Sequence, residues 1–152
     1  MEIIQFTSKY LQDFKRLNTE WLTQLFKVET HDEKVLSNPE KFIINPGGKI
    51  FLVKKQKEII GCVALIKITE NCYELTKMAI STNYRGQQIG QKLMSYTLEY
   101  AKQENWAKLI IYSSSKLPNA IHIYKKYGFV EIPLENGNPY QRADIKLELV
   151  IR

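Results

Sequence analysis

Long apolar runs are absent from this chain of 152 residues, and cysteine is scarce. No stretch approaches the roughly eighteen consecutive apolar residues of a membrane-spanning helix, so the sequence predicts no membrane partner. The only cysteines, Cys62 and Cys72, form no metal-binding pattern with His31 and His122. We therefore expect reduced thiols and no metal site. The start, Met-Glu-Ile-Ile, lacks a basic-then-apolar leader, and we expect a cytoplasmic protein.

An arginine-rich run, a zinc module and an aromatic RNA-binding signature are also missing, although the formal net charge is +6. The basic residues are scattered, so we expect no nucleic-acid partner. A basic nucleic-acid-binding domain is therefore the least favoured of the functions that this sequence suggests. The excess charge would instead help an anionic ligand to find its site. The length and the apolar fraction of 44% suit one globular domain over residues 1–152.

Apolar periodicity predicts an α/β (α+β) chain with a mixed, mostly antiparallel twisted sheet of about six to seven strands. Short turns join strands at 49–54, 58–68 and 72–80, which is typical of an antiparallel meander. Further expected strands lie near 3–6, 108–113, 129–130 and 143–151. Expected helices cover 10–25, 87–104 and 118–127, with a short turn at 33–36. The helix over 10–25 is either one bent helix or two helices with a break at Asn18-Thr19.

A glycine-containing loop, Arg85-Gly86-Gln87-Gln88-Ile89-Gly90, stands between the strand at 72–80 and the helix at 87–104. The first N–H groups of a helix lack internal partners, and the helix dipole adds partial positive charge beside them. Glycines let the chain turn and approach a ligand closely. A diphosphate is the expected occupant. Neither the dinucleotide pattern nor the nucleoside-triphosphate pattern matches this spacing.

Two segments carry a resemblance to a known family. The loop resembles the [Q/R]-x-x-G-x-[G/A] loop of GNAT N-acetyltransferases, which grips the pyrophosphate of acetyl-coenzyme A. Arg85 and Gly90 match its ends, whereas Gln88 stands where the family usually has glycine. The segment 119–129 resembles, in loose form, a second signature, N-x-x-A-x-x-x-Y-x-x-x-G-F. In the family this Asn contacts the cofactor and this Tyr protonates the leaving thiolate, which implies these roles for Asn119 and Tyr124.

The resemblance also implies an architecture and a cofactor site. In the family, helices cover both faces of the sheet, and two central strands splay apart around the pantetheine arm. Those strands would be 72–80 and 108–113 here. Paired protomers are common in the family, so a homodimer is an open option. The implied cofactor-binding residues for acetyl-CoA are Met78, Ala79, Ile80, Arg85, Gly86, Gln87, Gln88, Ile89, Gly90, Gln91 and Asn119.

Acetyl transfer to an amine needs a group that takes up the amine proton. Side chains alternate along a strand, which puts Glu74, Thr76 and Met78 on one face and Lys77 on the other. Glu74 is the candidate base, and glutamate stands at this strand position in several GNAT enzymes. An alternative is that Glu74 is an exposed residue paired with Lys67 on the neighbouring strand.

The expected activity is N-acetyl transfer from acetyl-CoA to a primary amine of a small molecule or protein, by direct attack in a ternary complex. Glu29 and His31 are candidate acceptor contacts, although a solvated turn explains them as well. Tyr124 has an alternative too, since it is one of nine tyrosines and packing would account for it. A non-catalytic acyl-CoA-binding regulatory module is the competing function. It needs the loop at 85–90 but neither Glu74 nor Tyr124.

Overall fold

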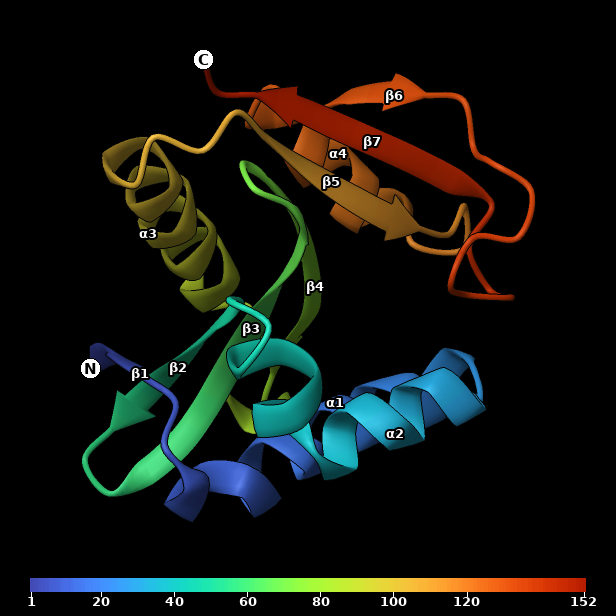
Figure 1. The fold of residues 1–152 in the computed structure, drawn as a ribbon. Coiled ribbons are helices and arrows are strands. Elements are labelled where there is room, and N and C mark those ends of the chain that lie inside the picture. The colour runs from blue at the N-terminus through green and yellow to red at the C-terminus, as the bar shows by residue number, and fades with distance from the viewer.

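One seven-stranded sheet organises the chain in a computed structural model that describes residues 1–152 (Figure 1). The strand order is β1-β2-β3-β4-β5-β7-β6. Every neighbouring pair is antiparallel except β4 and β5, which run parallel. The predicted fold class is therefore confirmed. The strands are β1 (Glu2–Gln5), β2 (Lys49–Lys55), β3 (Glu58–Thr69), β4 (Cys72–Ile80), β5 (Lys108–Ser113), β6 (Val130–Ile132) and β7 (Ile145–Val150).

Four α-helices flank the sheet: α1 (Leu11–Leu25), α2 (Thr30–Ser37), α3 (Ile89–Gln103) and α4 (Pro118–Lys126). Short helical turns occur at Ser8–Tyr10, Glu40–Ile44 and Thr82–Tyr84. None of the helices has both the length and the apolar character that a membrane crossing requires.

The possible break in the first helix is wrong, because α1 is continuous through Asn18. The Asn18 amide donates to the Phe14 carbonyl at 3.0 Å and to the Cys62 sulfur at 3.4 Å, so this buried side chain is satisfied inside the helix. The turn expected at 33–36 belongs to α2, an eight-residue helix. Glu29 and Asp32 start it with reciprocal side-chain-to-backbone hydrogen bonds, a capping box.

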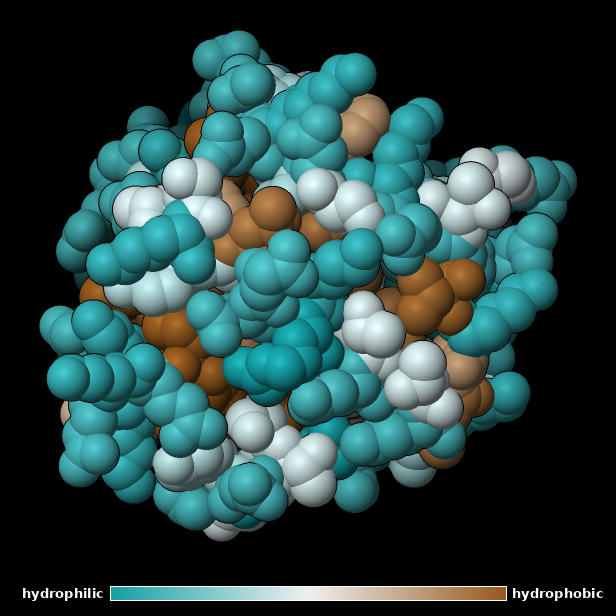
Figure 2. Space-filling model, turned by 90° about the horizontal axis from the view of Figure 1, so that it is seen from below, coloured by the Kyte–Doolittle hydropathy of each residue, from teal (hydrophilic) through white to brown (hydrophobic).

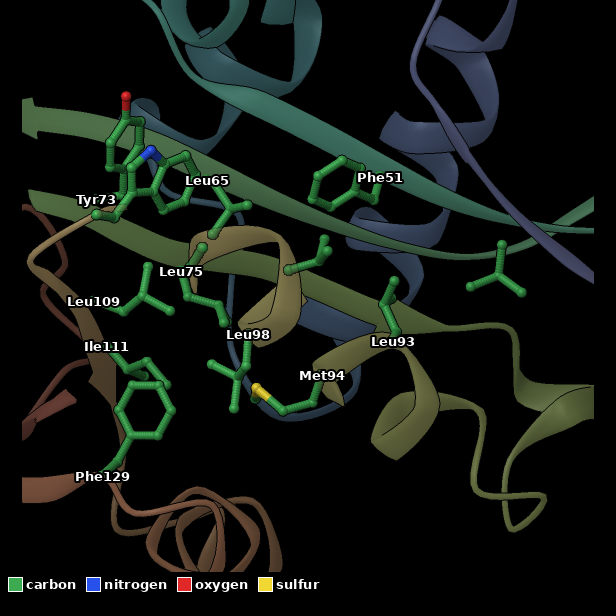
Figure 3. Packing of buried hydrophobic residues seen from close by; sticks show 14 of the residues in the cluster. Phe51, Leu65, Tyr73, Leu75, Leu93, Met94, Leu98, Leu109, Ile111 and Phe129 are labelled. Carbon is green, nitrogen blue, oxygen red and sulfur yellow. The ribbon is translucent and has the colours of Figure 1, made fainter. Parts of the chain in front are cut away.

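Alternating side chains of the strands feed two cores, one on each face of the sheet. On one face α3 packs on the sheet, and Figure 3 shows Met94 and Leu98 of α3 near Leu75 of β4 and Ile111 of β5. The other core joins α1 and α2 to the opposite face of the sheet. Its buried members are Phe14, Leu17, Leu22, Val35, Leu36, Ile43, Ile50, Leu52, Ile59, Cys62, Ala64 and Ala79.

The sheet opens between β4 and β5. Their pairing is limited to three steps, from Cys72 opposite Lys108 to Glu74 opposite Ile110, although both strands continue beyond this point. In Figure 1, β5, β6, β7 and α4 form one group, β1 to β3 with α1 and α2 form another, and β4 lies between them. This is the predicted splay. It leaves one backbone edge of β4 without a strand partner after Glu74.

The expected alternation along β4 fails at Lys77, which has a positive φ of 56°. The register with β3 shifts at the same place, from Ala64 opposite Thr76 to Cys62 opposite Ala79. This bulge moves the following side chains to the other face. Lys77 therefore shares the α2 side of the sheet with Glu74, whereas Met78 packs against the α3 core.

The face seen from below in Figure 2 is mainly hydrophilic, and its apolar residues show as separate patches. Isolated apolar side chains are normal on a protein surface. The large apolar residues with the greatest exposure are Val130, on the edge strand β6, and Val150, at the end of β7; each is 64% exposed.

Gly48, just before β2, provides a test of the packing. A Cβ there would lie 2.4 Å from the Leu65 carbonyl oxygen and 2.6 Å from that of Ile43, and backbone atoms cannot easily move aside. We expect Gly48→Ala to lower the free energy of unfolding by about 2 kcal/mol. Gly90→Ala is the matched control, because its Cβ would meet only Ile80, at 3.8 Å. Urea unfolding checks both; equal stabilities would contradict the packing described for Gly48.

Candidate active site

A cavity of about 900 Å³ occupies the opening between β4 and β5. Its wall draws on α1, β4, the loop before α3, the first turns of α3, β5, the loop and first turns of α4, and the segment 140–143. Apolar residues make up 19 of the 33 lining residues. A mostly apolar, concave site with a few polar groups is the usual form of a small-molecule site.

The N-terminus of α3 supplies one end of this cavity. Following the chain from Gly86 into α3, Lys92 is the first residue whose backbone N–H donates to another backbone group, the Gln88 carbonyl at 3.1 Å. The N–H groups of residues 86–91 therefore have no backbone acceptor. Together with the helix dipole they make a favourable environment for an anion.

Two residues in this loop take the left-handed conformation, Gly86 with φ 78° and Gln88 with φ 62°. Gln88 precedes the first residue of α3 and makes no side-chain capping bond. A non-glycine residue in this conformation costs about 1 kcal/mol. The Arg85 side chain lies on the surface, where it donates to the Gln24 side chain at 3.1 Å and to the Ile80 carbonyl at 3.4 Å.

The open edge of β4 and the start of α4 face the same cavity. Met78, Ala79 and Ile80 line it on the β4 side, and Asn119 and Tyr124 line it from α4. Burial raises the pKa of Tyr124 to about 12, with no side-chain hydrogen bond contributing. The phenol therefore keeps its proton at neutral pH and can donate it to a ligand in the cavity.

A buried phenol–carboxylate pair lies on the α2 side. Tyr140 is 3% exposed and lines the cavity, and its hydroxyl donates to a Glu74 carboxylate oxygen at 2.6 Å. Thr76 lies 3.2 Å from the same hydroxyl. Burial raises the pKa of the Glu74 carboxyl, an effect that Tyr140 and Lys77 partly oppose. The alternative of an exposed Glu74 paired with Lys67 is wrong, since Glu74 is 5% exposed and Lys67 pairs with Glu70.

Behind this pair, Asp32 holds two cations. Its carboxylate accepts from Lys77 at 3.0 Å and from both terminal nitrogens of Arg142, at 2.7 and 2.9 Å. These bonds lower the pKa of Asp32 to about 2 against the opposing effect of burial. Glu29 accepts from the backbone N–H groups of Gln141 and Arg142, at 2.9 and 3.2 Å. We call Asp32, Glu29, Lys77 and Arg142 the ionic clamp; it fixes segment 140–142 to α2 and β4.

Most of the residues expected to bind a cofactor meet around the cavity. The lining includes Met78, Ala79, Ile80, Arg85, Gly86, Gln88, Ile89, Gly90, Gln91, Asn119 and Tyr124. Gln87, Glu74, Glu29 and His31 are not among the lining residues. Glu29 is engaged in the ionic clamp, and the His31 ring packs edge-on against Tyr140 with centroids 5.4 Å apart. Contact of Glu29 or His31 with an acceptor stays a prediction.

Sequence reasoning did not identify Tyr140 and Arg142 as site residues. Each meets partners more than sixty positions away, as the bond from Tyr140 to Glu74 and those from Arg142 to Asp32 show. A Tyr-x-Arg pattern before the last strand was the available signal. No group of three or more His, Cys, Asp and Glu side chains is arranged to hold a metal ion.

Comparison with known proteins agrees with this arrangement. The model of the acetyltransferase (GNAT) family matches residues 11–129. An uncharacterized N-acetyltransferase of Schizosaccharomyces pombe is 28% identical over 125 residues, which cover 78% of this chain and 76% of the relative. A GNAT acetyltransferase structure from Staphylococcus aureus Mu50 superposes with a TM-score of 0.88 at 23% identity, over 99% of both chains.

A solved aminoglycoside 6′-N-acetyltransferase in complex with coenzyme A superposes with a TM-score of 0.75 at 16% identity, over 100% of this chain and 98% of that one. At such identities the two structures bear on the fold alone. The family model covers most of the chain, and the sheet opens where that fold requires it. The chain belongs to the GNAT family of acetyltransferases.

The ionic clamp predicts how stability depends on pH. The pKa of Asp32 is depressed in the folded state, so its stabilising contribution is present above pH 4 and is lost as the pH falls toward 2. Asp32→Asn leaves Lys77 buried without its charged partner. We expect it to lower the free energy of unfolding at pH 7 by about 3 kcal/mol. The variant should also lose part of the decline in stability between pH 4 and pH 2.

Urea unfolding at pH 7 and pH 3 measures both effects. Lys77→Met is the matched control, because Asp32 keeps its two bonds to Arg142. Adding Lys77→Met to Asp32→Asn should recover stability, since it removes the unpaired buried cation. Strictly additive losses would show that the two residues do not act as a pair.

Proposed function

We propose that this chain is an acetyl-CoA-dependent N-acetyltransferase that acts on a primary amine by direct attack in a ternary complex. One observation carries the proposal: a single cavity connects the unpartnered N–H groups at the start of α3, the open edge of β4 and the Tyr140–Glu74 pair. These are, in order, groups suited to a diphosphate, to amides of an extended arm, and to a reacting amine.

The residues present fit acetyl-CoA. N–H groups of residues 86–91 would bind the diphosphate, with Arg85 and the Asn119 side chain as further donors. The backbone of Met78 and Ile80 would pair with the pantetheine amides as an added strand. Bound acetyl-CoA supplies the activated acetyl group as a thioester.

Two side chains would then handle protons. Tyr124 keeps its proton at neutral pH, because burial raises its pKa, and it would donate to the departing thiolate. Glu74 is the predicted final acceptor of the amine proton, and its raised pKa suits that role. A backbone N–H of β4 near Met78 would stabilise the oxyanion. No covalent enzyme intermediate is needed, since the amine attacks the thioester directly.

Calorimetry with acetyl-CoA and a thiol-release assay together test this function. Wild-type protein should bind acetyl-CoA and release thiol when a primary amine is added. Tyr124→Phe removes only the hydroxyl, so turnover should fall about tenfold or more while acetyl-CoA affinity changes little. Arg85→Ala should do the reverse and weaken binding more than turnover at saturation.

The competing function, a non-catalytic acyl-CoA-binding module, predicts heat of binding without thiol release from any amine. Absence of both heat and thiol release would contradict both functions. An equal loss of affinity and turnover in Tyr124→Phe would make that residue a binding or packing residue.

The charges on the cavity wall favour one kind of acceptor. The charged lining residues are Lys77, Arg85, Lys116 and Arg142, and no carboxylate side chain lines the cavity. Lys77 and Arg142 are neutralised by the ionic clamp, and Arg85 would face the cofactor diphosphate, which leaves Lys116 as the wall cation without an anionic partner. Additional cationic groups on an acceptor would therefore be repelled. We propose an acceptor with a single amino group.

A panel of amines measures this preference. Phenethylamine carries one amino group and an aromatic ring that suits the apolar wall, whereas spermidine and kanamycin carry several cationic groups. We expect kcat/KM for phenethylamine to exceed that for spermidine by about tenfold or more. Lys116→Glu should reduce this ratio of kcat/KM values, because it replaces a cation of the wall with an anion. A preference for spermidine in the wild type would contradict the proposed acceptor class.

A further inference from the structure

Tyr140 occupies an unusual place for a side chain in a connecting segment. It lies in segment 133–144, between β6 and β7, yet it is almost fully buried and reaches the cavity wall. Its hydroxyl donates to Glu74 at 2.6 Å and lies 3.2 Å from Thr76. A hydrogen bond to a carboxylate at this distance is short and strong.

The ring of Tyr140 is held from several sides. The Lys77 ammonium nitrogen and the central guanidinium carbon of Arg142 each lie 4.8 Å from the ring centroid. His31 meets the ring edge-on. Both cations are fixed by Asp32, which is fully buried. The ionic clamp therefore sets where the Tyr140 hydroxyl points.

Glu74 cannot meet a ligand in the cavity directly, because it is buried and does not line the wall. Two residues that line the wall interact with the Glu74 carboxylate: Thr76, and Tyr140, whose hydroxyl donates to it at 2.6 Å. The other charged or titratable groups that influence Glu74 are Lys77 and Arg142, which are engaged with Asp32, and Tyr112. Tyr112 directs its own hydroxyl to Glu135, at 2.6 Å. Tyr140 makes the short hydrogen bond to Glu74, so the most direct path from the cavity to this carboxylate runs through its hydroxyl.

Resting on the proposed function, we propose that Tyr140 is a catalytic residue that passes the proton of the acceptor amine to Glu74. The amine nitrogen bonds to the thioester carbon, and the C–S bond breaks with its electron pair on sulfur. The N–H proton moves to the Tyr140 oxygen as the Tyr140 proton moves to Glu74. The thiolate takes the Tyr124 proton, which solvent later replaces. Tyr140 ends unchanged and Glu74 ends neutral. After product leaves, Glu74 returns the proton through the same hydroxyl to solvent.

Two properties of the pair suit this transfer. Burial raises the pKa of Tyr140 well above its ordinary value and the Glu74 carboxylate raises it further, so the hydroxyl stays protonated at neutral pH. A protonated phenol is no base by itself and must release one proton as it accepts another. The carboxyl of Glu74 has a raised pKa because of burial, which makes its carboxylate a better proton acceptor than an exposed one.

Tyr140→Phe tests the relay, because it keeps the ring contacts and removes the hydroxyl. With acetyl-CoA and the best acceptor among phenethylamine, spermidine and kanamycin, we expect kcat to fall about 100-fold. KM for acetyl-CoA and the melting temperature should change little. Tyr100→Phe is the matched control, since Tyr100 packs against Phe51 and Trp106 and does not line the cavity. It should retain wild-type kcat.

A double-mutant cycle separates a relay from two independent effects. When two groups act in series, removing either one already abolishes their joint contribution to kcat, and removing the second costs nothing more. The double variant of Tyr140→Phe and Glu74→Gln should therefore lose about as much kcat as either single variant. The acidic limb of the kcat profile, which Glu74 sets in the wild type, should disappear in both single variants.

Three outcomes overturn the relay. They are wild-type kcat in Tyr140→Phe, losses that multiply in the double variant, and an acidic limb that survives Tyr140→Phe. Each of these leaves the proposed function standing, because wild-type turnover is measured in the same assay. If the wild type binds acetyl-CoA but acetylates none of the amines, the proposed function falls and the relay falls with it.

Discussion

The ending of the β4–β5 pairing at Glu74 and Ile110 is the constraint on which the rest of the structure depends. Backbone N–H and C=O groups of a strand normally form hydrogen bonds with a neighbouring strand. Leaving them unpaired within a sheet is costly unless water or a ligand forms these bonds instead. Here both strands continue past the last pair, so the sheet encloses a cavity. A fully paired β4 would leave no room for an extended ligand.

Two features keep the opening from closing. The core under α3 spans the opening, from β2 to β5 and β7, whereas the core under α1 and α2 lies on the other face and involves β2, β3 and β4. The bulge at Lys77 then turns the end of β4 so that Met78 packs under α3 while Lys77 reaches Asp32. Buried charges are costly unless they are paired, and the clamp pairs them. The same contacts hold Tyr140 at the cavity wall.

Local features of the sequence predicted the sheet, the long helices and the loop at 85–90. Periodicity identifies strands and helices because the signal lies within each segment, and the loop is specified by neighbouring glycines and a helix start. The continuity of α1 was harder to predict, because the buried Asn18 amide donates a hydrogen bond to the sulfur of Cys62, 44 positions away. The eight residues of α2 are too few for a clear period.

Sequence reasoning named Glu74 and Glu29 but could not predict how the polar groups of the site pair, and the reason is physical. Arg142 and Asp32 are 110 positions apart, and only the folded chain brings them together. The bulge at Lys77 has no glycine to mark it, so strict alternation assigned Lys77 and Met78 to the wrong faces. By contrast, Asn119 and Tyr124 were found through a motif, and both lie on the cavity wall.

Hydrogen exchange of individual amides tests the central claim most directly, namely that the opening of the sheet is where a cofactor binds. NMR spectroscopy would follow the exchange with and without acetyl-CoA. The account predicts slower exchange in residues 86–91 and along β4 from Met78 to Ile80, with little change in β1 and β2. Unchanged exchange in both segments, at an acetyl-CoA concentration that saturates binding, would contradict it.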